Sequence, residues 1–180
     1  MEHFGEKDLG ILEYFDKKDL GILEFLISFA ELKYTKKMSY PVSDIANKLL
    51  HRAYVDEGSE LMSNMKLQKM LYYEQGFHLA YFGTPLFDAE IVAWQYGPVV
   101  PEIYNLYKCN GRNGIVPKSD PIILEQLEEN LFNEVFEVYN EYSASGLVTQ
   151  THSEKPWQET SLNGVISNES MQSFFADRLE

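Results

Sequence analysis

The chain has 180 residues, of which 44% are hydrophobic and 24% are charged, a composition typical of one globular domain and not of a disordered protein. Its 28 acidic and 15 basic residues give a net charge of −13, which disfavours direct binding to nucleic acid or to an anionic membrane. A single cysteine, Cys109, excludes an intrachain disulfide and a cysteine-based zinc site. No segment has the pattern of a signal peptide or a membrane span, so we expect a cytoplasmic protein.

A duplicated segment comes first in the chain. The nine residues that begin at Lys7 recur from Lys18, with seven identities at an offset of eleven residues. On a helix, eleven residues return to nearly the same face, because each residue turns by about 100°. We predict a helical arm over residues 1–37, which is either a simple duplication or a surface for homodimerisation or partner binding. A compact domain is predicted over residues 38–180.

Two helices are predicted at the start of this domain. The first covers about residues 44–56, and the second covers residues 65–82 behind a capping residue at Asn64. Gly83 ends the second helix. This helix is apolar on nearly every side, which is typical of a helix at the centre of a domain. Gly76 within it indicates a close crossing with another helix.

A small β element is predicted next. Residues 90–94 form a strand, residues 96–98 form a turn, and a helix runs from Pro101 to about Cys109. Ile115 and Val116 are expected to form a second strand that pairs with the first.

A long helix is predicted after Pro121. Its apolar residues at helical spacing are Leu124, Leu127, Leu131, Val135, Val138 and Tyr142. Residues 119–154 hold eight acids and no lysine or arginine, which indicates either a solvated face or a surface that attracts a basic protein. Shorter helices are expected over residues 143–152 and 168–178, on either side of an irregular stretch at Pro156. Together these elements predict a mainly α fold with a small two-stranded β element.

One pair of side chains has the spacing of metal ligands. Glu74 and His78 lie four residues apart on the central helix, but no HExxH motif or third ligand accompanies them. We therefore expect no metal, and we interpret His78 as a core histidine hydrogen-bonded to its neighbours.

A second group, from Thr151 to Glu154, supplies hydroxyls, an imidazole and a carboxylate. Adjacent side chains seldom converge into a catalytic arrangement, which depends on geometry. We expect Thr151 and His152 to bond to backbone near Pro156, and Trp157 to anchor the C-terminal segment. No nucleotide or other cofactor motif is present. The residues favour a binding protein over an enzyme, and catalysis by Glu74 with His78, or by His152 with Glu154, is the less favoured alternative.

Three blocks of sequence resemble the Panacea domain, a family of SocA-like and phage-associated GepA-like antitoxins. They are MKLQKMLYYEQGFHLA at residues 65–80, a block over residues 85–104 that contains IVAWQYGPVVPEIY, and LVTQTHSEKPW at residues 147–157. The resemblance covers about residues 38–160. It implies that the following signature residues hold the fold: Lys66, Leu67, Gln68, Tyr72, Gln75, Gly76, His78, Gly97, Pro98, Thr151, His152, Pro156 and Trp157.

The resemblance implies an antitoxin that neutralises a bacterial or phage toxin, encoded by an adjacent gene, through direct protein–protein binding. One branch of the family delivers a toxin to the ClpXP protease, so a proteolytic adaptor is the alternative. Some relatives carry an N-terminal DNA-binding domain, but residues 1–37 are too short and too acidic for one. Rigid aromatic residues and acids suit the binding of a basic toxin. The predicted contact residues are Trp94, Tyr96, Pro98, Glu102, Tyr104, Glu128 and Glu134.

Overall fold

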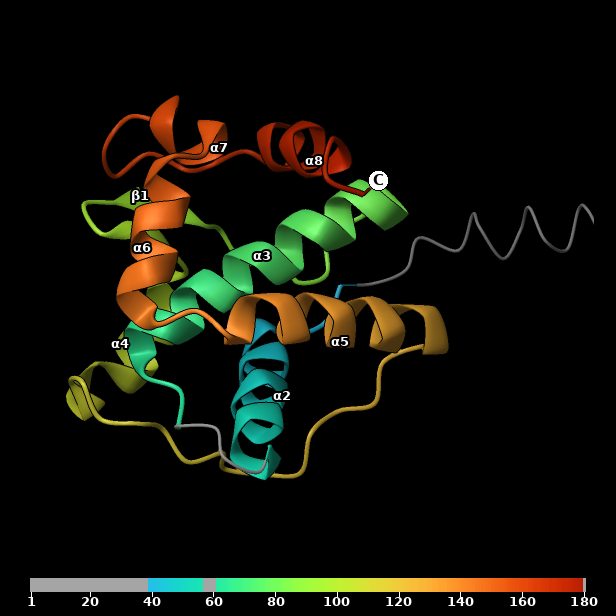
Figure 1. Ribbon diagram of the computed structural model, residues 1–180, viewed down its shortest axis with the longest axis vertical. Helices are drawn as coiled ribbons and strands as arrows, with labels where there is room; N and C mark the ends of the chain where they lie inside the picture. The colour runs from blue at the N-terminus through green and yellow to red at the C-terminus, as the bar shows by residue number, and fades with distance from the viewer. Residues whose placement is uncertain (1–38, 57–60, 180) are drawn as a thin grey trace, which may run out of the picture. The chain divides into compact units, whose positions relative to one another are not determined.

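The structure is mainly helical, as predicted (Figure 1). The computed structural model describes residues 39–56 and 61–179, so the predicted arm and its repeat lie outside the described residues. This part of the chain contains seven α-helices and one two-stranded sheet. The helices are α2 (Val42–Val55), α3 (Asn64–Phe82), α4 (Pro101–Tyr107), α5 (Gln126–Asn140), α6 (Ala144–His152), α7 (Lys155–Gln158) and α8 (Asn168–Ala176). The strands are β1 (Val92–Trp94) and β2 (Gly97–Val99), and a 3₁₀ turn, η1 (Lys108–Asn110), extends α4.

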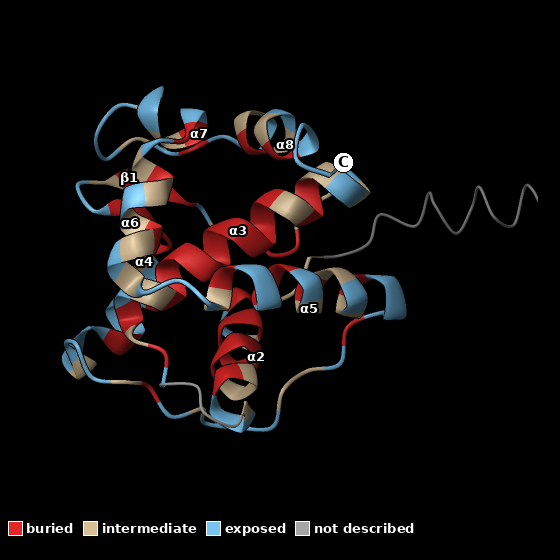
Figure 2. Cartoon of the chain, in the orientation of Figure 1, coloured by how far each residue is buried: buried red, intermediate tan, exposed pale blue. Residues whose placement is uncertain are grey.

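Helix α3 lies at the centre of the described fold, as its sequence predicts. Figure 2 shows it buried along most of its length, and buried residues occur on every side of the helix. Ser63, and not Asn64, caps its first turn, because the Ser63 hydroxyl accepts a hydrogen bond from the Lys66 amide. At the other end, Gly83 adopts a φ of 71° and its amide donates to the Leu79 carbonyl, which stops the helix.

Helix α8 packs tightly on α3 at Gly76. A Cβ atom at Gly76 would lie 2.1 Å from the Phe175 ring, so only glycine leaves room for that side chain. The ring of Phe175 is fully buried and meets Tyr72 and Tyr73 edge to face, with centroid distances of 5.4 and 5.9 Å. These contacts confirm the close helix crossing predicted from Gly76. Helices α2, α5 and α6 contact α3 as well (Figure 1).

The sheet is a tight hairpin in which Val92 pairs with Val99 and Trp94 pairs with Gly97. The prediction that Ile115 and Val116 form the second strand is wrong. The Ile115 amide instead donates to the Met62 carbonyl, just before α3, at 2.9 Å.

Pro98 lies in β2, although the sequence around it suggests a turn; the turn is at residues 95 and 96. Proline lacks the amide proton that a strand normally donates. Ala93, the residue opposite Pro98, directs its amide to the Gly164 carbonyl and its carbonyl to the Asn163 amide. The hairpin therefore needs no hydrogen bond from Pro98.

Helix α5 begins later and faces differently than predicted. It starts at Gln126, and the preceding residues from Pro121 are not helical. Its buried residues are Glu128, Phe132, Val135, Phe136 and Tyr139. The predicted core residues Leu127 and Val138 are 62% and 56% exposed. The rings decide the face, because burying aromatic side chains removes more apolar area from water than burying leucine or valine.

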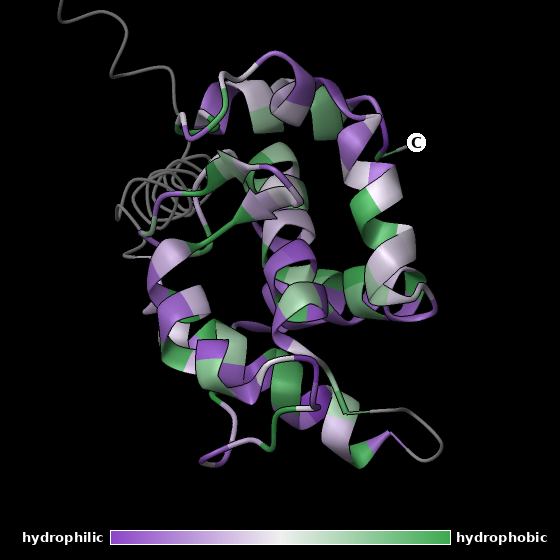
Figure 3. Cartoon of the chain, turned by 90° about the vertical axis from the view of Figure 1, so that its left-hand side faces the viewer, coloured by the Kyte–Doolittle hydropathy of each residue, from purple (hydrophilic) through white to green (hydrophobic). Residues whose placement is uncertain are grey.

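The remaining helices agree with the sequence except around Pro156. The stretch that was expected to be irregular is the short helix α7, which accommodates Pro156 in its first turn, where no intrahelical amide bond is lost. Figure 3 shows that the helices carry both hydrophobic and hydrophilic residues. Within residues 39–56 and 61–179, no helix is long and apolar enough to cross a membrane.

Candidate functional site

The first half of α3 holds the backbone of β2 in place. The Val100 amide donates to Gln68 Oε1 at 2.9 Å, and the Lys69 ammonium donates to the Pro98 carbonyl at 2.9 Å. Both α3 side chains are almost completely buried. Burial lowers the pKa of Lys69 to about 7, because an apolar environment disfavours the charged amine.

The end of α6 packs against the same strand. Gly97 has a φ of 96°, and a Cβ atom there would lie 2.8 Å from the Thr151 hydroxyl oxygen and 2.9 Å from Lys69 Cε. Glycine is therefore required at this position for both its backbone conformation and its lack of a side chain. The Thr151 hydroxyl donates to the Leu147 carbonyl at 2.9 Å, one turn earlier in α6. The prediction that it bonds near Pro156 is wrong, because Thr151 lies within a helix.

His152 and Trp157 support the other strand. The Trp157 indole N–H donates to the Trp94 carbonyl at 3.0 Å, and the Trp157 and His152 rings stack with centroids 4.0 Å apart. Burial lowers the pKa of His152, while a hydrogen bond with the backbone of Gln95 acts in the opposite direction. The His152 ring thus contacts Trp157 and the hairpin, and not the backbone near Pro156 as predicted.

Three of the predicted contact residues line one surface pocket. Trp94, Tyr96 and Tyr104 border a pocket of about 310 Å³, whose other lining residues include Asn64, Met65, Gln68, Lys69 and Lys108. The Trp94 and Tyr104 rings meet edge to face with centroids 4.9 Å apart. Tyr96, in the hairpin turn, is 62% exposed. Rigid aromatic rings around an apolar pocket are the kind of surface that anchors a partner's side chain.

The other predicted contact residues lie outside this aromatic pocket. Pro98 is buried, and Glu102 is exposed on the first turn of α4 without lining the pocket. Glu134 is exposed on α5 and lines a different pocket, of about 400 Å³. Glu128 is only 3% exposed, so the prediction that it is a surface acid is wrong.

Glu128 is buried because its carboxylate is paired inside the protein. The Tyr40 hydroxyl donates to Glu128 Oε2 at 2.8 Å, and His78 Nε2 lies 3.0 Å from Oε1. His78 Nδ1 donates to the Thr84 carbonyl at 2.7 Å, since a carbonyl oxygen only accepts. His78 is therefore a core histidine hydrogen-bonded to its neighbours, as predicted, and it joins α3 to α5.

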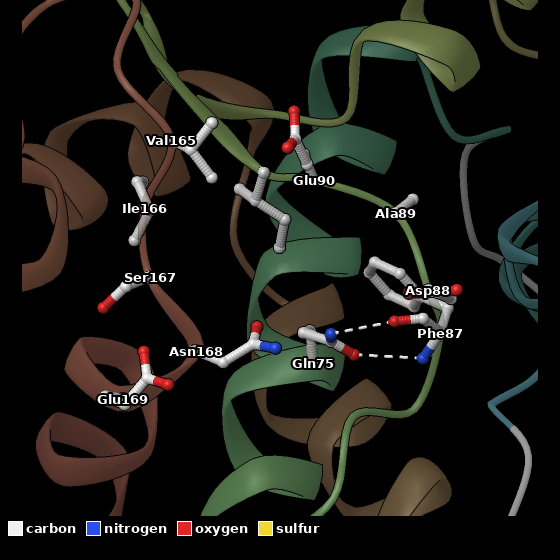
Figure 4. Close-up of a pocket in the computed structure, with 11 residues that line it drawn as sticks. Gln75, Phe87, Asp88, Ala89, Glu90, Val165, Ile166, Ser167, Asn168 and Glu169 are labelled. Carbon is white, nitrogen blue, oxygen red and sulfur yellow. Dashed lines mark hydrogen bonds between the residues drawn. The ribbon is translucent and has the colours of Figure 1, made fainter.

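Gln75 organises the segment that follows α3. Its Oε1 accepts from the amides of Leu86 and Phe87 at 2.9 and 3.1 Å, and its Nε2 donates to the Phe87 carbonyl at 3.1 Å. Figure 4 shows the two bonds between Gln75 and Phe87 in a pocket of about 240 Å³, with the Asn168 side chain directed toward Gln75. All the polar atoms of the Gln75 amide group thus bond to the protein's own backbone.

The other signature residues join helices or fill the core. The Lys66 ammonium donates to the Asn140 carbonyl at 2.6 Å and so connects α3 to the end of α5. Leu67 and Tyr72 are fully buried in the core, and Pro156 is buried in α7.

The carboxylates of the two pairs considered for catalysis lie in the core. Glu74 is buried, its Oε1 has no hydrogen-bond partner, and burial raises its pKa well above the usual value. Glu154 accepts a hydrogen bond from the Tyr73 hydroxyl at 3.1 Å, and burial raises its pKa. His78 contacts Thr84 and Glu128, whereas His152 contacts Trp157 and Gln95, so the two histidines do not share a hydrogen-bond partner.

The acids of the described residues do not form a metal centre. Within residues 39–56 and 61–179, no three histidine, cysteine or acidic side chains converge in an arrangement that would hold an ion. The acids that border the pocket of Figure 4, Asp88, Glu90 and Glu169, point in different directions.

The burial of Lys69 and the Tyr73–Glu154 pair were not predicted from the sequence. A lysine is seldom fully buried, so its residue type alone gives no reason to expect it in the core. The one signal was its place on a helix that is otherwise apolar nearly all round. Tyr73 and Glu154 are 81 residues apart, and nothing in their local sequence indicates that they meet.

Comparisons with known proteins cover the residues that build this site. The family described as "Antitoxin SocA-like, Panacea domain" matches residues 67–158. Antitoxin SocA of Caulobacter vibrioides (strain NA1000 / CB15N) is 32% identical over 142 residues, which cover 69% of this chain and 71% of the relative. No solved structure matches the chain. The family match includes most of α3, the whole hairpin and the segment that carries Thr151 and Trp157, and on this basis the chain belongs to the family of SocA-like antitoxins with a Panacea domain.

Proposed function

We propose that this protein is an antitoxin of a bacterial or phage toxin–antitoxin system and that it neutralises its toxin by direct binding in the cytoplasm. Membership of the SocA-like family supports the antitoxin role. The observation that carries the binding mechanism is the exposed aromatic pocket of Trp94, Tyr96 and Tyr104. The toxin, encoded by an adjacent gene, would insert an apolar side chain into this pocket.

The rigidity of the hairpin supports this role. Lys69 and Trp157 donate hydrogen bonds to its backbone, Gln68 accepts one from the Val100 amide just after it, and Gly97 packs against Thr151. A surface that is already ordered loses little conformational freedom when a partner binds. Tyrosine and tryptophan rings add large contact areas with few rotatable bonds. The net charge of −13 would also speed the approach of a basic toxin.

The direct test is rescue of a host that expresses the product of the adjacent gene. Tyr96→Ala should reduce rescue and weaken binding of the purified toxin about tenfold, which corresponds to about 1.4 kcal/mol. Tyr54→Ala is the matched control, because Tyr54 is 56% exposed but lies on α2. Both variants should melt within a few degrees of the unchanged protein. Equal affinity of the two variants for the toxin would argue against the aromatic pocket.

The amount of toxin in the same cells distinguishes neutralisation from delivery to a protease. Neutralisation leaves the toxin intact in a complex that can be purified. Loss of the toxin in normal cells, with recovery in cells that lack ClpXP, would instead identify an adaptor.

A folded His152→Gln variant tests for catalysis. It should rescue normally, because the ring of His152 stacks on Trp157 and takes no part in a chemical step in this proposal. Lost rescue with unchanged toxin binding would point to an enzyme.

A further inference from the structure

The outward face of α5 carries apolar side chains that the fold leaves uncovered. Leu127 and Val138 are 62% and 56% exposed, and Leu131 lies between them, partly exposed on the same side of the helix. These residues are spaced by four and seven positions, which places them in one stripe along the helix. A stripe of this kind usually faces another helix.

A pocket of about 400 Å³ opens where this stripe reaches Val138. Phe77 and Tyr139 line it, and their ring centroids lie 5.9 Å apart. Leu179 at the end of the described chain also lines it and is 40% exposed. The pocket is large enough to receive one or two apolar side chains from a partner. We call the stripe and this pocket together the α5 groove.

Acidic side chains accompany the α5 groove. Glu134 lines the pocket, Glu141 is exposed one turn beyond Val138, and residues 119–154 contain no lysine or arginine. Arg178 is the one cation that lines the pocket. Its guanidinium lies 3.6 Å from the Phe174 ring centroid and donates to the Phe174 carbonyl, so it is already engaged within the protein.

We propose that the α5 groove binds a basic amphipathic helix of a partner protein. The apolar side of that helix enters the groove, and its flanking lysine or arginine side chains pair with Glu134 and Glu141. Leu127 and Val138 are separated by about 16 Å along the axis, at 1.5 Å per residue, so the groove suits a helix of about three turns. A second copy of this chain is a poor occupant, because it would bring the same acids to the contact.

This inference rests on the proposed function in one respect: the helix that occupies the α5 groove belongs to a protein that this chain binds. The aromatic pocket and the α5 groove share no lining residue, so each can be tested alone.

The probe is a synthetic 15-residue helical peptide of leucine and lysine, with its leucines at positions i, i+3, i+4 and i+7. One control peptide has the same composition in scrambled order, and a second replaces each lysine with glutamate. The full chain should bind the amphipathic basic peptide at least tenfold more tightly than either control, as measured by fluorescence anisotropy. Affinity should fall at 0.5 M salt, because salt screens the pairing with Glu134 and Glu141.

Variants of the protein locate the contact. Val138→Glu should weaken peptide binding at least tenfold, because it places a charge in the apolar groove. Val116→Glu is the matched control, since Val116 is 57% exposed and lies outside the groove, and it should leave binding unchanged. Leu127→Glu provides a second groove variant if Val138→Glu melts early.

Three results would overturn the proposal. The first is that the protein binds the scrambled peptide as tightly as the amphipathic basic peptide. The second is that the Val138→Glu and Val116→Glu variants bind the basic peptide with equal affinity. The third is that the protein sediments as a dimer and that Val138→Glu dissociates this dimer. The last result would make the groove an interface between copies. Failure of peptide binding, combined with rescue that still depends on Tyr96, would reject the α5 groove and leave the proposed function standing.

Discussion

Single buried polar side chains on α3 determine how the surrounding backbone is arranged. Gln68 binds the amide just after β2, Gln75 binds the segment at Leu86 and Phe87, and His78 binds the Thr84 carbonyl. The bonds of Gln68 and Gln75 satisfy backbone groups that would otherwise be buried without a partner, which costs about 1–3 kcal/mol for each group. A helix that is apolar nearly all round in sequence thus specifies its neighbours through its few polar residues.

Lys69 should make stability depend on pH. Its pKa is about 7 in the folded protein and 10.5 in the unfolded chain, so between these values the unfolded chain binds more protons. The free energy of unfolding therefore rises with pH in this window, and the penalty for burying the charge is fully present below pH 7. Relative to Lys69→Met, the unchanged protein should gain about 2 kcal/mol between pH 7 and 9. Urea unfolding at both pH values measures this difference.

Lys108→Met is the control for this prediction, because Lys108 is exposed beside Asn105. Its stability relative to the unchanged protein should be the same at pH 7 and pH 9. If the difference in free energy of unfolding between Lys69→Met and the unchanged protein is also the same at both pH values, the Lys69 amine is not buried in the way described.

Gly76 should tolerate no side chain. Gly76→Ala places a Cβ atom 2.1 Å from the Phe175 ring, and the resulting overpacking should lower the free energy of unfolding by about 2 kcal/mol. Gly146→Ala in α6 is the matched control, since its Cβ atom would lie no closer than 3.3 Å to its neighbours. That change should be neutral or stabilising by up to about 1 kcal/mol, because alanine favours a helix. Similar losses for both variants would argue against the crossing.

At the scale of elements, strong local signals in the sequence were sufficient to locate a helix. Pairings that depend on long-range contacts could not be predicted from it. The glycine stop at Gly83 and the continuous apolar character of α3 located that helix closely. The partner of β1 was missed because a proline normally argues against a strand, and only the contacts of Ala93 with Asn163 and Gly164 make Pro98 acceptable.

The face of α5 was misread because two apolar stripes share that helix. The aromatic stripe from Phe132 to Tyr139 faces α3, and the aliphatic stripe that includes Leu127 faces outward. Sequence spacing indicates that both are stripes, but only packing decides which one is buried. The same limit applies to the site: the aromatic cluster at Trp94, Tyr96 and Tyr104 was predictable as a group, whereas the burial of Glu128 depends on Tyr40 and His78.

Substitution of two acids on α5 should therefore affect stability to very different extents. Glu128→Ala removes the carboxylate that accepts from the Tyr40 hydroxyl and lies against His78 Nε2, and should lower the free energy of unfolding by about 3 kcal/mol. Glu134→Ala should change it by less than about 0.5 kcal/mol, because Glu134 is exposed. Urea denaturation of both variants tests the assignment. A stable Glu128→Ala protein would show that this acid is not part of the core.

For the whole molecule, the proposed function assigns complementary roles to charge and apolar surface. The acids would supply long-range attraction to a basic partner, which salt weakens, whereas the aromatic pocket and the α5 groove would supply short-range contact. The two surfaces lie on different elements of the described fold, so a partner that reached both would be held at two separate places.

The start of the folded domain at residue 38 remains a prediction from the sequence. Tyr40 ties the start of the described chain to distant residues: its amide donates to the Leu86 carbonyl at 2.8 Å and its hydroxyl donates to Glu128 at 2.8 Å. A chain of residues 38–180 keeps both bonds and should lose less than about 1 kcal/mol of stability relative to the full chain. A chain of residues 42–180 loses both and should be destabilised by about 2–3 kcal/mol.

Urea unfolding followed by circular dichroism compares these two shortened chains with the full protein. Residues 1–37 hold eight acids and six bases, so their removal changes the net charge only from −13 to −11. Attraction to a basic partner should therefore survive in the chain of residues 38–180, and its association rate with the toxin should fall with added salt nearly as steeply as that of the full chain. If that chain is insoluble or melts far below the full protein, the first 37 residues belong to the folded core and the boundary at residue 38 is wrong.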